Sequence, residues 1–272
     1  MYLPLAAVVT LLTVGGYTVG KRILNRPAVS VCGKLSLGGA LAVGLVGLVG
    51  GTLGTLTYVR NQDYRSDLII WQDTLEKRPG NVRALHNRGA AYCRLGLIEA
   101  GIADYSRAIE LRPETADVYV SRGAAYTQKG LLDEGIRDCT EAIRLQPAAV
   151  NAYLNRGVAC YHKRLFDHAV SDFSRAIELA PRNAQAYNNR GLAYDDKREF
   201  DQAIRDYTRA VHLDPDFAEA YNNRAVSLFF VGRYDDSRAD VAACRRLGYA
   251  PNPGFIQALE RASGEPRQTA PP

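Results

Sequence analysis

Residues 189–194 read NRGLAY, and closely similar stretches occur four more times in the chain at intervals of 34 residues. The others are NRGAAY at 87–92, SRGAAY at 121–126, NRGVAC at 155–160 and NRAVSL at 223–228. Prolines at 79, 113, 147, 181 and 215 keep the same interval. A fixed period of this length predicts a repeat architecture, in which each unit buries its apolar face against the next unit.

Each unit also contains a second repeated segment. These segments are GIADYSRA from Gly101, GIRDCTEA from Gly135, AVSDFSRA from Ala169, AIRDYTRA from Ala203 and the more divergent SRADVAAC from Ser237. The small residue in each first segment would let two helices approach closely, with an aromatic residue filling the adjoining space. Proline ends the second helix because it cannot continue one. We therefore expect two helices in every unit.

This helix-turn-helix unit of 34 residues, with its small residue, tyrosine and closing proline, resembles the tetratricopeptide repeat (TPR). The resemblance implies an all-α, right-handed superhelical solenoid, whose concave wall is made by the first helices and commonly binds peptides. Five repeats spanning 82–251 are expected, at 82–115, 116–149, 150–183, 184–217 and 218–251. Before them we expect a partial repeat helix within 60–81; after them we expect a capping helix at 252–262 and a disordered tail at 263–272.

Two positions depart from the TPR pattern in all five units. Arginine stands where the family usually has leucine, and aspartate stands where it often has tyrosine. We expect the two to pair across the helices of each repeat, as a structural feature. The pairs are Arg88 with Asp104, Arg122 with Asp138, Arg156 with Asp172, Arg190 with Asp206, and Arg224 with Asp240.

A polar ladder is expected along the concave wall, one residue per repeat. Its members are Asn87, Ser121, Asn155, Asn189 and Asn223. Because an amide both donates and accepts hydrogen bonds, the ladder could bind the main chain of an extended peptide. The alternative is that these side chains bond only their own helices or water.

Charged residues near the ladder predict a groove that runs from basic to acidic. Arg83 and Arg94 belong to the first repeat, whereas Asp195 and Asp196 belong to the fourth. Such a gradient would orient a ligand with opposite charges at its ends. At the end of the array, Phe229 and Phe230 form either an apolar anchor site or, as we prefer, a cover for the capping helix.

Two stretches without charged residues precede the repeats, at 1–20 and 35–59. Since about 20 apolar residues cross a bilayer, residues 35–59 predict a transmembrane helix. Residues 1–20 are expected to form a first transmembrane helix, with a hydrophobic hairpin arm or a short interfacial segment as the alternative. The loop 21–34 is basic, and the positive-inside tendency favours its placement in the cytoplasm. We therefore expect an integral protein of a bacterial inner membrane with an extracytoplasmic repeat domain.

The sequence contains no phosphate-binding loop, zinc-protease motif or nucleophile elbow, so we predict no catalytic residues, metal or cofactor and no small-molecule substrate. The net charge of +5 is modest and includes four basic residues of the loop 21–34, which argues against nucleic acid as a partner. We therefore predict a membrane-anchored scaffold, not an enzyme, that binds a protein or peptide in its groove. The alternative is an accessory or C-terminal portion of a membrane glycosyltransferase-like system, because DLIIWQDTLEKRPGN, from Asp67, follows the apolar stretches as in such proteins.

Overall fold

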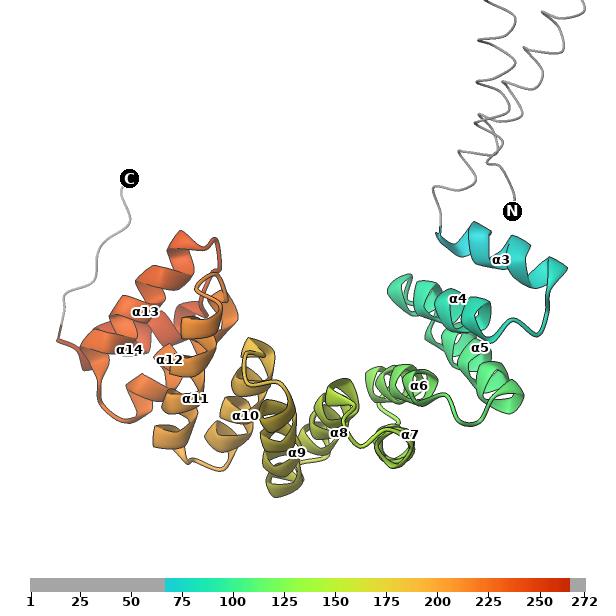
Figure 1. Cartoon of the computed structure of the whole chain (residues 1–272). Coiled ribbons are helices and arrows are strands. Elements are labelled where there is room, and N and C mark those ends of the chain that lie inside the picture. Colours follow the sequence, from blue (N-terminus) through green and yellow to red (C-terminus); the bar gives the residue numbers. More distant parts are fainter. Residues whose placement is uncertain (1–66, 265–272) are drawn as a thin grey trace, which may run out of the picture. The chain divides into compact units, whose positions relative to one another are not determined.

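The computed structural model describes residues 67–264, and this part of the chain consists of twelve α-helices (Figure 1). Helix α3 (Asp67–Lys77) comes first, and α14 (Pro253–Ala262) comes last. Between them lie five helix pairs: α4 (Val82–Arg94) and α5 (Ile98–Leu111), α6 (Ala116–Gln128) and α7 (Leu132–Leu145), α8 (Val150–His162) and α9 (Phe166–Leu179), α10 (Ala184–Asp196) and α11 (Phe200–Leu213), α12 (Ala218–Phe230) and α13 (Tyr234–Arg246).

The predicted transmembrane helices at 1–20 and 35–59 and the loop 21–34 lie outside the described residues, as do 60–66 of the partial repeat and 265–272 of the tail. Among residues 67–264, none of the helices combines the length and the apolar character that crossing a membrane requires. The transmembrane helices predicted at 1–20 and 35–59 are therefore treated below as a proposal.

Close packing between the two helices of a repeat depends on the small residue of the first helix. At Gly191 in α10, an added Cβ would lie 2.6 Å from Cε1 of Tyr207 in α11, whose ring is completely buried. A larger residue would therefore push the two helices apart, and the aromatic ring takes the space that glycine leaves.

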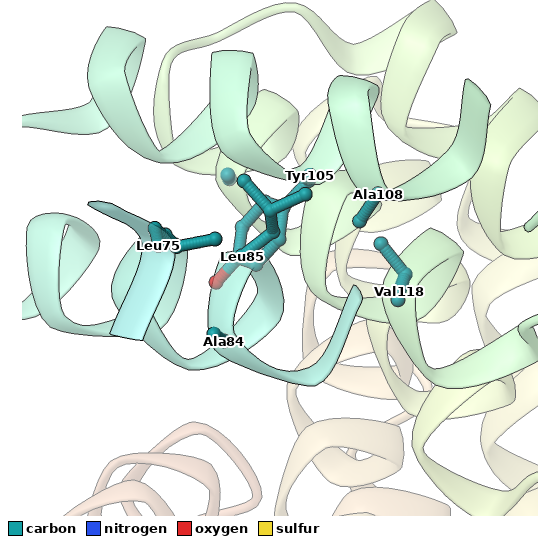
Figure 2. Close-up of a cluster of buried hydrophobic side chains, with 7 residues drawn as sticks. Leu75, Ala84, Leu85, Tyr105, Ala108 and Val118 are labelled. Carbon is teal, nitrogen blue, oxygen red and sulfur yellow. The ribbon is translucent and has the colours of Figure 1, made fainter. Parts of the chain in front are cut away.

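Helix α3 covers the apolar face that the first repeat would otherwise expose. Leu75 of α3 packs with Ala84 and Leu85 of α4, Tyr105 of α5 and Val118 of α6 in one buried cluster (Figure 2). Residues from four helices thus share one core at the start of the array. A repeat that lacks a preceding neighbour needs such a cover.

Helix α14 closes the other end of the array. Its Phe255 and Leu259 pack against a cluster that includes Val241 of α13 and Phe229 of α12. The rings of Phe229 and Phe255 meet edge to face, with centroids 5.8 Å apart. Phe229 therefore serves the capping helix, whereas the exposed Phe230 stacks on Phe200 with centroids 5.0 Å apart.

The second helix of every repeat begins without a side-chain cap. The N-cap residues are Leu97, Leu131, Leu165, Glu199 and Arg233, and none accepts a hydrogen bond from its helix. In contrast, Asn183 caps α10 by accepting a bond from the amide of Ala186 at 3.1 Å. Leucine cannot accept such a bond, so three second helices leave their first amides to water.

The substitution Leu131→Asn should therefore stabilise the repeat domain. We expect the free energy of unfolding, measured by native-state hydrogen exchange in α7, to rise by about 0.5–1 kcal/mol, because asparagine can bond a free amide of the first turn. Leu131→Ala removes the same exposed apolar surface without adding a cap. An equal gain in both variants would show that capping is not the cause.

Candidate functional site

The five first helices form the inner side of a curved array. The first helices of consecutive repeats contact one another, α4 with α6, α6 with α8, α8 with α10 and α10 with α12. They follow the inner side of the arc in Figure 1, where the second helices lie outside them. All five ladder residues are on these first helices, and each side chain is half-buried.

The ladder connects consecutive repeats by hydrogen bonds. At three of the four junctions, a ladder side chain contacts the residue that lies 35 positions earlier, on the preceding first helix. These contacts join Ser121 Oγ to His86 Nε2 (2.8 Å), Asn155 Nδ2 to the carbonyl of Val120 (3.4 Å) and Asn223 Nδ2 to Asn188 Oδ1 (3.1 Å). These three contacts run between helices, so they differ from the alternative in which ladder side chains bond only their own helices or water.

Two ladder residues do not make such a bond between repeats. Asn189 Oδ1 accepts a bond from Gln185 on its own helix at 2.8 Å, which leaves the Asn189 amide nitrogen with two donor hydrogens. The side chain of Asn87 makes no hydrogen bond to another residue of the described part. Donors and acceptors therefore remain along the inner wall for a ligand.

The charged residues of the predicted gradient differ in their exposure. Arg83 and Arg94 are exposed on α4, and Asp196 is exposed on α10. Asp195 differs because its side chain is half-buried and bonded within the array, so it is not a freely accessible charge.

Asp195 joins three helices of the fourth and fifth repeats. Ser227 of α12 donates a hydrogen bond to its Oδ1 at 2.7 Å, and the hydroxyl of Tyr207 in α11 donates one to its Oδ2 at 2.8 Å. Burial raises the pKa of this carboxyl to about 6, although both hydroxyl donors act in the opposite direction. The carboxyl therefore changes its protonation state about two pH units above an exposed aspartate.

The structure brings together the arginine and the aspartate of all five repeats. In each, the arginine Nε and Nη2 donate to the two aspartate oxygens at 2.7–2.9 Å, and the aspartates are only 4–7% exposed. These hydrogen bonds to aspartate raise the pKa of each arginine, so each guanidinium stays charged. Two parallel bonds fix the relative orientation of the two helices.

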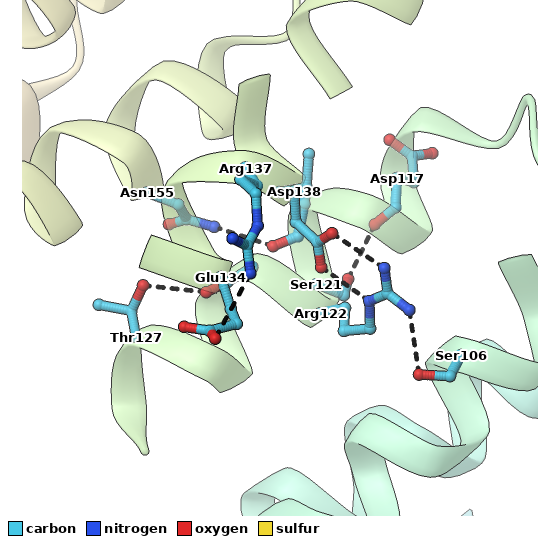
Figure 3. A network of polar contacts seen from close by, with 11 residues as sticks. Ser106, Asp117, Ser121, Arg122, Thr127, Glu134, Arg137, Asp138 and Asn155 are labelled. Atoms are coloured by element: carbon cyan, nitrogen blue, oxygen red, sulfur yellow. Dashed lines mark hydrogen bonds and ion pairs between the residues drawn. The ribbon is translucent and has the colours of Figure 1, made fainter. Parts of the chain in front are cut away.

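Four of the arginines also reach the preceding repeat. Figure 3 shows Arg122 between Asp138 and the hydroxyl of Ser106, to which its Nη1 donates at 3.0 Å. The equivalent bonds are Arg156 to Thr140 (3.1 Å), Arg190 to Ser174 (2.9 Å) and Arg224 to Thr208 (3.1 Å). These hydroxyl groups were not predicted from the sequence, although they too recur every 34 residues.

Within residues 67–264, no group of three histidine, cysteine, aspartate or glutamate side chains is placed to hold a metal ion. A cavity of about 510 Å³ lies beside α14, lined by residues that include Tyr249, Ile256 and Glu260. Its lining contains none of the predicted groove residues. The inner wall is therefore the candidate functional site.

Family models for the tetratricopeptide repeat match consecutive parts of the array. They match residues 116–148, 150–183, 184–217 and 206–239, and a model described as TPR repeat matches 89–130. Together these matches cover more than half of the chain. No curated protein sequence matches it.

Solved structures share the fold at low sequence identity. MamA is 24% identical with a TM-score of 0.54, and the match covers 59% of this chain and 94% of MamA. YrrB, described as a TPR protein with an unusual peptide-binding site, is 18% identical with a TM-score of 0.54, covering 71% and 97%. For pilF from Pseudomonas aeruginosa the identity is 16% and the TM-score 0.62, covering 68% and 85%. The family matches and the observed fold together show that the chain belongs to the tetratricopeptide repeat family.

Proposed function

We propose that this protein is a membrane-anchored scaffold that binds an extended segment of a partner protein along the inner wall of its repeats. The observation that carries the proposal is the ladder, which keeps unused hydrogen-bonding groups at Asn87 and Asn189 after its bonds between repeats are made. Main-chain groups of an extended peptide would pair with such amides. YrrB, which shares the fold, is described as having a peptide-binding site, which supports this reading.

The membrane anchor is proposed from the sequence. Residues 35–59 contain no charged side chain and are long enough to cross a bilayer as a helix, with residues 1–20 as a proposed first crossing. The basic loop 21–34 between them favours a cytoplasmic loop, and thus a repeat domain outside the cytoplasm at the inner membrane. A scaffold held there would gather its partner at the membrane surface.

Photo-crosslinking from chosen positions in cells tests the groove. A photoreactive amino acid in place of Gln185, which is exposed beside Asn189, should give a discrete adduct with a partner protein. The same amino acid in place of Arg205, exposed on the outer helix α11, is the matched control. Adducts formed from the outer position alone would contradict binding along the inner wall.

A second measurement separates recognition from folding. Asn87→Ala together with Asn189→Ala should reduce the adduct from position 185 several-fold, because the amides that would bind the peptide are gone. Thermal unfolding should change little, since neither side chain links two repeats. An unchanged adduct yield would show that the ladder does not bind the partner.

A further inference from the structure

A row of exposed leucines lies along the turns that join the two helices of each of the first three repeats. Leu97, Leu131 and Leu165 are 52%, 38% and 38% exposed, and the neighbouring Leu95 is 63% exposed. Three of these are the uncapped N-cap residues described above. A polar residue at these positions would cap the helix and would expose less apolar surface than leucine does.

Ion pairs between consecutive repeats show that these turns are neighbours in space. Lys129 pairs with Glu99 of the preceding repeat at 3.0 Å, and Lys163 pairs in the same way with Asp133. Lys197 continues the series with Asp167 at 2.8 Å. The leucines beside these lysines therefore form one continuous row, which we call the leucine edge (Leu95, Leu97, Leu131, Leu165).

Two arginines in the turns of the third and fourth repeats have a left-handed backbone conformation. Arg164 and Arg198 have φ of 62° and 61°, whereas three other repeats have glycine at the same point of the turn. Left-handed backbone is less favourable for arginine than for glycine at this point of the turn. Both side chains are exposed, and neither forms an ion pair with a carboxylate of the described residues, although the Arg164 guanidinium lies over the ring of Phe166, 5.2 Å from its centroid. The arginine in the third repeat directly precedes Leu165 of the edge.

We propose that the leucine edge lies against the interface of the bilayer that anchors the chain, with Arg164 and Arg198 directed to anionic lipid headgroups. This inference rests on the membrane anchoring proposed above. Only seven residues, 60–66, separate the apolar stretch 35–59 from α3, and they span at most about 25 Å. The array therefore begins within a short length of chain of the proposed membrane helix.

The proposed membrane anchor explains why a small apolar edge is sufficient for contact with the bilayer. A few leucine side chains and two exposed arginines bind a bilayer only weakly when a protein is free in solution. Anchoring turns this contact into an intramolecular one with a high effective concentration of the interface. The array would then lie along the bilayer with its inner wall open to a partner.

Proximity to lipid can be measured on the full chain in nanodiscs of phosphatidylcholine and phosphatidylglycerol that carry a nitroxide headgroup lipid. We expect the leucine methyl NMR signals of Leu97, Leu131 and Leu165 to lose more than half of their intensity. Leu111 is the matched control, since it is 39% exposed at the other end of α5. The proposal would be overturned if the leucine edge lost no more signal intensity than Leu111 does. It would also be overturned if each disc held two chains whose leucines cover each other.

The variant Leu97→Asn, Leu131→Asn, Leu165→Asn separates membrane contact from stability. Asparagine should cap α5, α7 and α9, so the variant should unfold at the same or a higher temperature, while the loss of signal at Leu95 falls to the level of Leu111. An unchanged loss at Leu95 would overturn the assigned role of the three leucines. Failure of the wild-type chain to elute with the discs would refute the membrane anchor itself, and the leucine edge with it.

Discussion

The substitution Arg190→Leu should lower the free energy of unfolding of the fourth repeat by about 3 kcal/mol. It removes the guanidinium that donates two hydrogen bonds to Asp206, whose carboxylate is only 6% exposed. The carboxylate would then be buried without its cation, and the hydroxyl of Ser174 would lose the bond from Arg190. Native-state hydrogen exchange in α10 and α11 would measure the loss locally, which suits an array that need not unfold in one step.

The double variant Arg190→Leu, Asp206→Tyr should recover most of this loss. It replaces the pair by the leucine and tyrosine that the TPR family usually has at these positions, so no buried charge remains. The interaction energy from the complete double-mutant cycle should exceed 1 kcal/mol, as found for residues in direct contact. As a control, Asp73→Asn breaks an ion pair on the surface, in which the side chain of Asp73 is 47% exposed and that of Lys77 is 61% exposed. This substitution should lower the free energy of unfolding by less than about 0.5 kcal/mol. A single variant at Arg190 as stable as the wild type would mean that the pair adds nothing to stability.

The periodic features of this protein could be predicted from its sequence because each of them occurs five times. An arginine and an aspartate that recur together, such as Arg122 and Asp138, can be assigned to a pair without coordinates. The repeat boundaries follow from the same period. The resemblance to a known repeat added the order of the helices and the identity of the inner wall.

Features that interrupt the period could not be predicted in this way. Asp195 stands where the other repeats have cysteine, threonine, tyrosine or phenylalanine, so no second example indicated its role. Its partners Tyr207 and Ser227 come from two other helices, and their approach depends on how the fourth and fifth repeats stack. The bonds of the ladder were missed for a similar reason, because the amide chemistry is visible in the sequence but the distance between repeats is not.

Asp195 should make the stability of the last two repeats depend on pH. Its pKa is about 6 in the folded protein, raised by burial from the usual 3.8. Well below pH 3.8 the carboxyl is protonated in both the folded and the unfolded state, so it carries no charge that burial could penalise. As the pH rises from about 4 to 6 the unfolded chain ionises first, and the folded state loses stability. A shift of one pKa unit corresponds to ~1.4 kcal/mol. Because Asp195 is partly exposed, we expect the free energy of unfolding to fall by about 2 kcal/mol.

Comparison with Asp195→Asn isolates this contribution from the other carboxylates. The asparagine does not ionise, so the stability of the variant relative to the wild type should rise by about 2 kcal/mol between pH 4 and pH 7.5. Hydrogen exchange in α10 and α12, measured at matched pH values, gives the free energies of unfolding of both proteins.

Ser227→Ala should enlarge the pH-dependent loss of stability of the otherwise wild-type chain, because it removes a donor that favours the ionised carboxylate. If the wild type and the asparagine variant instead kept a constant difference across this range, Asp195 would titrate as an ordinary surface carboxylate. The Ser227 and Tyr207 contacts would then hold the repeats together without coupling them to pH.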